Sequence, residues 1–82
     1  MTKIKLFTGQ YIDKEYFDDT LSAFLKETWK RKKISELTHD HEECMLTFET
    51  ISKDTEDYYY VSNNHNVITV KAFEHYIKHS VN

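Results

Sequence analysis

Residues 13–33 have the sequence DKEYFDDTLSAFLKETWKRKK, and their large side chains recur at the spacing of one helix face. The recurring positions are Phe17, Leu21, Phe24, Leu25, Thr28 and Trp29. This periodicity predicts an amphipathic helix over about residues 14–32, with Asp13 as its N-cap. Acidic side chains near its start and the basic run 30–33 at its end would both suit the helix dipole.

Segments on both sides of this helix have strand patterns. Strands are expected over residues 3–8, 44–52 and 58–62, with weaker candidates over 33–38 and 67–68. In the second of these strands, alternation would place Cys44, Leu46 and Phe48 on one side of the sheet. The polar segments are expected to be turns or connections: 39–43, 53–57 and 62–66.

The C-terminal segment predicts a second helix. Thr69 is its expected cap, and an apolar stripe follows it to about Ser80. The element order is then β-α-β-β-β-α. We therefore expect a single domain over residues 1–82 with an α+β fold, in which a small antiparallel sheet of three to four strands carries both amphipathic helices on one face.

Composition excludes several classes of protein. The 82 residues are 39% hydrophobic and 15% aromatic, which is enough apolar material for a folded core. One cysteine cannot form an internal disulfide, and one glycine cannot build a phosphate-binding loop. The sequence shows neither an apolar run of membrane-spanning length nor a signal-peptide pattern, so we expect a soluble cytoplasmic protein.

The amino-acid usage also points to an origin. The chain has ten lysines but one arginine, two alanines, one glycine and no proline. Residues encoded by AT-rich codons are therefore frequent in this chain, and residues encoded by GC-rich codons are rare. This bias predicts an AT-rich genome, such as that of a low-GC bacterium, its plasmids or its phages.

Residue types that could carry chemistry do not form a catalytic or metal-binding pattern. His75 and His79 lie one helical turn apart, and His39 and His41 precede Cys44. The expected helix turns both C-terminal histidines to solvent, and a zinc site needs about four ligands. The expected strand buries Cys44 as a small apolar side chain. We therefore expect no metal site, no cofactor and no enzymatic activity.

The tyrosine run 58–60 is the main candidate for a binding surface. Side chains alternate along a strand, so the three rings cannot all point into one core. Either the exposed rings contact a partner, or they fill a sheet that is buried on both faces. The expected partner-binding residues are Tyr58 and Tyr60 with the acidic residues Asp54, Glu56 and Asp57.

Size, composition and the lack of catalytic motifs favour a small non-enzymatic protein-binding module with a larger protein partner. In size and composition alone, the chain resembles inhibitors of host or defence machinery such as anti-CRISPR proteins. The resemblance implies an accessory protein of a phage or mobile element that inhibits a host or defence protein.

Two other functions follow from other features. A nucleic-acid-binding protein would use the basic end of the first helix, and the residues concerned are Trp29, Lys30, Arg31, Lys32 and Lys33. A homodimer could form through an exposed strand edge or a tyrosine-bearing face. A mild net charge of −3 indicates neither a general nucleic-acid binder nor a strong polyanion.

Overall fold

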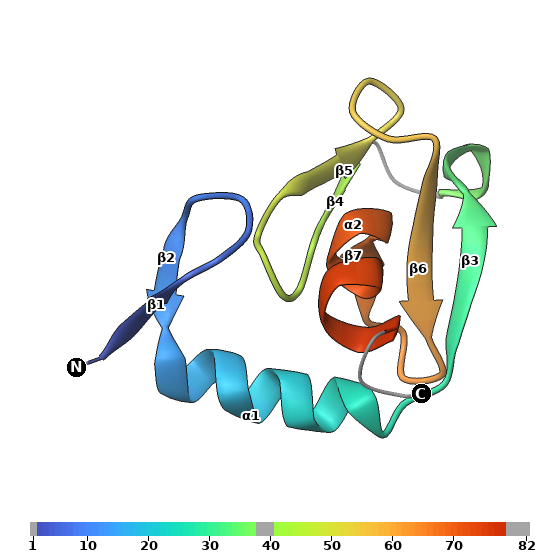
Figure 1. Cartoon of the computed structure of the whole chain (residues 1–82). Helices are drawn as coiled ribbons and strands as arrows, with labels where there is room; N and C mark the ends of the chain where they lie inside the picture. Colours follow the sequence, from blue (N-terminus) through green and yellow to red (C-terminus); the bar gives the residue numbers. More distant parts are fainter. Residues whose placement is uncertain (1, 38–40, 79–82) are drawn as a thin grey trace.

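The computed structural model describes residues 2–37 and 41–78 (Figure 1). Its strands are β1 (Lys3–Lys5), β2 (Tyr11–Asp13), β3 (Trp29–Lys33), β4 (His41–Glu43), β5 (Thr50–Ser52), β6 (Tyr58–Ser62) and β7 (Val67–Thr69). Its helices are α1 (Lys14–Leu25), a 3₁₀ turn (Ile34–Glu36), and α2 (Val70–Ala72), which continues as a π-helical segment (Phe73–Lys78). We call residues 70–78 the C-terminal helix.

The strands form three small antiparallel sheets, and the predicted single sheet is wrong. These sheets are the hairpin β1–β2, the hairpin β4–β5 and a three-stranded sheet in the order β3-β6-β7. The predicted order β-α-β-β-β-α is also wrong, because it has four strands whereas the described residues form seven. Strands β2 and β4 were not expected, and the weak candidate over 67–68, which forms part of β7, was not counted in that order. Most strands are only three residues long, which is too short for a period-two pattern to locate them.

The N-terminal segment is a hairpin, and the strand predicted over residues 3–8 ends at Lys5. The chain turns back at Gly9, whose φ of 92° lies in the region that glycine adopts without strain. The Leu6 N–H donates to the Gln10 carbonyl at 2.8 Å, and β2 then leads directly into α1.

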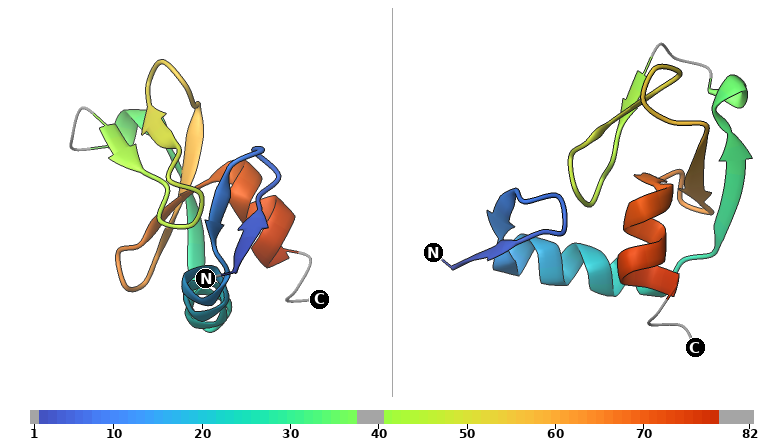
Figure 2. Two further views of the ribbon diagram at one scale, coloured as in Figure 1. Left: turned by 90° about the vertical axis from the view of Figure 1, so that its left-hand side faces the viewer. Right: turned by 45° about the horizontal axis from the view of Figure 1, so that its top comes forward.

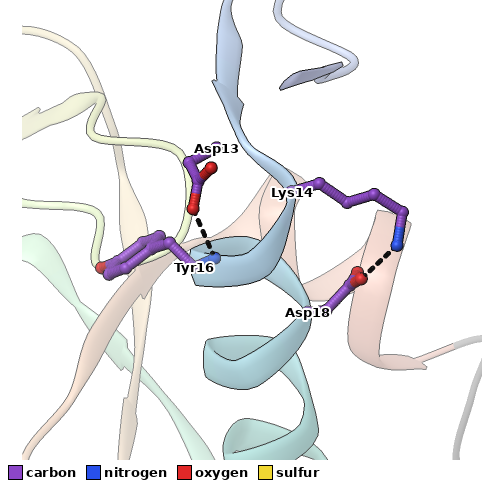
Figure 3. A network of polar contacts seen from close by, with 4 residues as sticks. All are labelled: Asp13, Lys14, Tyr16 and Asp18. Carbon is purple, nitrogen blue, oxygen red and sulfur yellow. Dashed lines mark hydrogen bonds and ion pairs between the residues drawn. The ribbon is translucent and has the colours of Figure 1, made fainter. Parts of the chain in front are cut away.

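Helix α1 begins as predicted but ends seven residues early, at Leu25 rather than at 32. At its start, the Asp13 carboxylate accepts the Tyr16 N–H at 3.0 Å (Figure 3). Beyond its end, the Trp29 indole N–H donates to the Phe24 carbonyl at 2.9 Å. Tertiary contacts therefore override the helical periodicity, and the predicted interaction of the basic run with the helix dipole does not occur.

The turn between α1 and β3 is bound to the turn between β6 and β7. The Asn63 side chain accepts the Thr28 N–H at 3.0 Å, and the Asn66 amide donates to both Glu27 carboxylate oxygens. Burial by itself would raise the pKa of Glu27, but hydrogen bonds from Ser62, Asn66 and Asn64 outweigh it and lower that pKa. The ionised carboxylate therefore helps to hold β3 beside β6.

We expect the Glu27→Gln variant to be less stable than the parent at pH 7. A lowered pKa in the folded state stabilises the fold above the carboxyl's ordinary pKa of 4.5, and this stabilisation disappears as the pH falls through the lower folded value. The loss at pH 7 should be about 1 kcal/mol or less, since the carboxylate is largely solvated. Thermal unfolding at pH 7 and at acidic pH measures it. An equal gap at both pH values would contradict the assignment.

Residues 44–49 form the loop of the β4–β5 hairpin, so the strand predicted over 44–52 is wrong except at its end. The Cys44 N–H donates to the Glu49 carbonyl at 2.7 Å, and the Phe48 N–H donates back to the Cys44 carbonyl. Cys44 and Leu46 are fully buried, whereas the Phe48 side chain is 50% exposed. The loop therefore places its side chains differently from the predicted alternation.

The C-terminal helix packs on one face of the three-stranded sheet. Its predicted cap is confirmed, because the Thr69 hydroxyl accepts the Ala72 N–H at 3.0 Å. Phe73 stacks on Tyr60 with 3.8 Å between ring centroids. The predicted end near Ser80 lies outside the described residues. Helix α1 does not share this face: it runs along the lower side of the molecule in Figure 1 and contacts the C-terminal helix, a placement that Figure 2 repeats.

Candidate protein-binding surface

The pairing of β3 with β6 brings two separately predicted sites together. Arg31 lies opposite Tyr60, and Lys33 lies opposite Tyr58. Side chains of directly paired residues lie on the same face of a sheet. The basic run and the tyrosine run are therefore neighbours on one sheet, although residues 34–57 separate them in the sequence.

The three tyrosines of β6 have different environments. Tyr59 is buried on the opposite face from its neighbours, and burial, with further contributions from Glu36 and Glu42, raises its pKa. Tyr60 is half-buried beneath Phe73 of the C-terminal helix. Tyr58 is 38% exposed, so it presents the most accessible ring of the run.

Tyr58 is part of a mixed aromatic and charged surface at the end of the sheet. The Arg31 guanidinium lies over the Tyr58 ring, 4.7 Å from its centroid. A shallow hollow beside them is lined by Lys33, Ile34, Ser35, Asp57 and Tyr58. We call Arg31, Lys33, Asp57 and Tyr58 the edge patch. Tyrosine and arginine together are typical of residues that dominate binding at protein interfaces.

The predicted acidic residues lie in the β5–β6 connection, next to this patch. Asp54 and Asp57 are exposed, whereas Glu56 is partly buried. Burial and the nearby Glu49 raise the pKa of Glu56, while Lys71 partly offsets this effect. The Ser52 N–H donates to the Thr55 hydroxyl at 3.0 Å, which helps fix the connection. The edge patch therefore has the acidic β5–β6 connection on one side and the basic strand β3 on the other.

The other side chains of the basic run point to the opposite face of the sheet. Lys30 and Lys32 contribute to a second shallow hollow, and its other lining residues are Thr28, Val61, Ser62, Asn63 and His65. Trp29 belongs to neither hollow. Its ring packs edge-on against Phe24 and Phe73, so it is part of the core boundary.

A third surface was not predicted from the sequence. Tyr16 stacks on Phe48, and the Tyr16 hydroxyl donates to the Met45 carbonyl at 3.3 Å. All three side chains are more than a third exposed. Phe48 has a φ of 64°, which is unusual for a bulky residue. Alternation predicted Phe48 to be buried, so only a correct placement of the hairpin loop would have revealed this patch.

The described residues that were considered for chemistry are dispersed or buried. Within residues 2–37 and 41–78, no group of three potential metal ligands lies together. His75 stacks on Phe7 at 4.8 Å, and Cys44 is fully buried and accepts the Thr47 N–H at 3.4 Å. His39 and His79 lie outside the described residues.

No protein-family model matches this chain, and neither a curated protein nor a solved structure shows significant similarity to it. In the part of the chain that the structure describes, no helix has the length and apolar character needed to cross a bilayer.

Proposed function

We propose that this chain is a small non-enzymatic protein-binding module that docks on a larger protein through the edge patch. The observation that carries the proposal is the exposed pair of Arg31 and Tyr58 at the outer end of the sheet. The guanidinium lies on the ring, so a partner would meet both side chains as one surface. Such a surface combines apolar area with a directional cation.

The neighbouring residues support this role for the patch. Lys33 and Asp57 add opposite charges around the shallow hollow beside the Tyr58 ring. A centre with apolar area and a polar rim is the usual arrangement of a protein interface. The acidic residues Asp54 and Glu56 extend that rim. Tyr60 supports the edge patch indirectly, because its ring stacks on Phe73 and holds β6 against the C-terminal helix.

The proposal extends to the biological setting. Amino-acid usage supports an accessory protein of a phage or mobile element from an AT-rich genome, acting in the cytoplasm on a host or defence protein. A binding module of this size can inhibit a larger partner by covering a functional surface. Affinity capture from a low-GC bacterial lysate treated with nuclease, read by mass spectrometry, would identify that partner.

We expect Tyr58→Ala to weaken binding of the captured partner at least about tenfold, a loss of about 1.4 kcal/mol. The side chain is 38% exposed, so the fold should survive its removal. Tyr11→Ala is the matched control, because Tyr11 is 65% exposed and lies on the hairpin β1–β2, across the molecule from β3 (Figure 1). Titration calorimetry with each variant measures the difference.

Equal binding by the Tyr58 and Tyr11 variants would overturn the assignment of the edge patch. A loss seen instead with Phe48→Ser would move the interface to the patch formed by Tyr16, Met45 and Phe48. A lysate that yields no protein partner for the unmodified chain would overturn the proposed function.

Nucleic-acid binding is the second candidate, because Lys30 and Lys32 face the same hollow as His65. This hollow lies on the opposite face of β3 from the edge patch. Substitutions at Lys30 and Lys32 therefore test nucleic-acid binding, and a substitution at Tyr58 tests protein binding. Nucleic-acid binding predicts that replacing both lysines by glutamine abolishes binding, that binding falls steeply with salt, and that Tyr58→Ala has no effect. The stacking role predicted for Trp29 would require its ring to leave Phe24 and Phe73.

A further inference from the structure

We infer that the outer edge of β3 accepts an extended acidic segment of the partner as an additional strand of the β3-β6-β7 sheet. The inference rests on the proposed protein-binding function and specifies how the partner binds and what its contact segment is made of. It follows from three observations: the backbone groups that β3 turns outward, the coverage of the opposite sheet edge, and the charges along β3.

The hydrogen bonds between β3 and β6 show which backbone groups of β3 face outward. The Asn63 N–H donates to the Thr28 carbonyl at 3.0 Å, and the Ile34 N–H donates to the Asp57 carbonyl at 2.9 Å. In both bonds, an even-numbered residue just beyond one end of β3 is joined to a residue that flanks β6. Hydrogen-bonded and non-hydrogen-bonded pairs alternate along an antiparallel ladder, so the N–H and C=O groups of Trp29 and Arg31 point away from β6.

These outward groups lie at an open edge. Strand β3 is the terminal strand of its sheet, and Figure 1 shows it at the outside of the molecule. Among residues 2–37 and 41–78, no strand pairs with its outer side. The adjacent Lys33 N–H is occupied by the Glu36 carboxylate at 3.0 Å. The available backbone groups are therefore centred on Arg31.

The opposite edge of the same sheet is covered. At the outer side of β7, the Met45 N–H from the β4–β5 loop donates to the Val67 carbonyl at 2.9 Å. The fold thus protects one edge with its own chain and leaves the other accessible. An accessible row of N–H and C=O groups is the template used when an extended peptide adds a strand to a sheet.

The charges of β3 select the kind of strand that can bind there. Four of its five residues are cationic, and the ion pair Lys14–Asp18 is the only one formed among the described residues. Within residues 2–37 and 41–78, therefore, none of the four cationic side chains forms an ion pair with a carboxylate. Arg31 and Lys33 lie on one face and Lys30 and Lys32 on the other, so an added strand would meet cations on both of its faces.

The same charges disfavour a second copy of this chain at this edge. Pairing β3 with β3 of another copy would place lysine and arginine side chains opposite one another, and like charges in such cross-strand pairs are destabilising. Lysine-rich edges are a known protection against unselective strand pairing. A strand rich in aspartate and glutamate overcomes this protection, because each cross-strand pair then joins opposite charges.

The test uses a fluorescent synthetic peptide of about eight residues, a length within the usual range of strands. Pairs of glutamates alternate with pairs of threonines in it, so that both faces of the strand carry carboxylates. A second peptide has the same sequence with N-methyl groups on alternate residues of the edge-facing side. It keeps every charge but cannot donate hydrogen bonds to β3. Fluorescence anisotropy with the full chain should show binding of the first peptide and at least about tenfold weaker binding of the second.

Two variants test the same point on the protein. Arg31→Gln removes the charge and keeps the outward N–H, whereas Arg31→Pro removes both. Proline is tolerated on an edge strand where its nitrogen faces outward, so the β3–β6 ladder should remain intact. We expect Arg31→Pro to bind the acidic peptide at least about tenfold more weakly than Arg31→Gln does. Circular dichroism checks the fold, and the peptide comparison does not depend on either variant.

Equal affinity for both peptides would overturn the inference, because binding would then depend on charge alone. So would an acidic peptide that fails to bind at about 1 mM. If a captured protein still requires Tyr58 in either case, the proposed function stands and only strand addition is wrong. If a single-stranded oligonucleotide competes with the peptide and no protein is captured, both proposals fail and the nucleic-acid alternative is favoured.

Discussion

Replacing Leu46 by alanine is expected to lower the free energy of unfolding by about 2–5 kcal/mol, the range for buried leucines. Leu46 is fully buried although it lies in a loop. Ordered backbone surrounds it, since the Cys44 N–H and the Glu49 carbonyl close that loop at 2.7 Å. The loop therefore has little freedom to collapse into the space, and the cost should fall in the upper part of the range.

Met45→Ala is the matched control for this variant. Met45 is the preceding residue in the same loop, but its side chain is 42% exposed. Its structural contact with β7 is made by its backbone N–H, which alanine retains. Surface substitutions of this kind usually change stability by less than about 0.5 kcal/mol. Urea unfolding of both variants followed by circular dichroism measures the difference, and equal losses would contradict the placement of the loop.

Removal of the Trp29 ring should be equally damaging, with an expected loss of about 3–5 kcal/mol for Trp29→Ala. The ring packs edge-on against Phe24 of α1 and Phe73 of the C-terminal helix, at 5.2 and 6.4 Å between centroids. Its indole N–H also donates to the Phe24 carbonyl at 2.9 Å. One side chain thus joins the first residue of β3 to two helices.

Trp29→Phe separates the two contributions of the tryptophan. Phenylalanine keeps an aromatic ring but loses the hydrogen bond to the Phe24 carbonyl, a loss of about 1 kcal/mol with a further term for poorer packing. The order of stability should be parent, Trp29→Phe, then Trp29→Ala. Urea unfolding monitored by circular dichroism provides the values. If Trp29→Ala cost no more than Lys30→Ala, the ring would not be joining these elements.

Features set by local chemistry were predictable from the sequence. Asp13 and Thr69 cap helices as expected, because each cap depends on a side chain and an N–H three residues away. The strand 58–62 was predicted with its exact bounds, since aromatic and β-branched residues are concentrated there.

Features set by distant contacts were not predictable. The positions of Thr28 and Trp29 suit a helix, but Asn63 and Phe24 bind them in another conformation. The alternation of Cys44, Leu46 and Phe48 suits a strand, but a hairpin loop buries the first two and exposes the third. The predicted helix extended to residue 32 and so included most of the basic run, which the structure places in β3. Without β3 in its correct position, the pairing of the strands could not be derived from the sequence.

The candidate site shows the same division. Its residues were selected from the sequence by their charged or aromatic type, but their grouping depends on the register of β3 with β6. Without that register, Tyr58 and Arg31 belonged to competing hypotheses. The structure places the Arg31 guanidinium 4.7 Å from the centroid of the Tyr58 ring, so residues from the two hypotheses form one surface. Lys30 and Lys32, two lysines of the nucleic-acid hypothesis, lie on the opposite face of the sheet.

The division into three sheets has a consequence for the order in which the chain folds. The hairpins β1–β2 and β4–β5 and the pair β6–β7 each join strands that follow one another in the sequence, so each closes a short loop. The pairing of β3 with β6 closes a longer loop, residues 34–57. The hairpin β4–β5 forms inside that loop and shortens the remaining path. Early formation of β4–β5 should therefore accelerate the pairing of β3 with β6, so this hairpin should influence how fast the open edge of β3 is assembled.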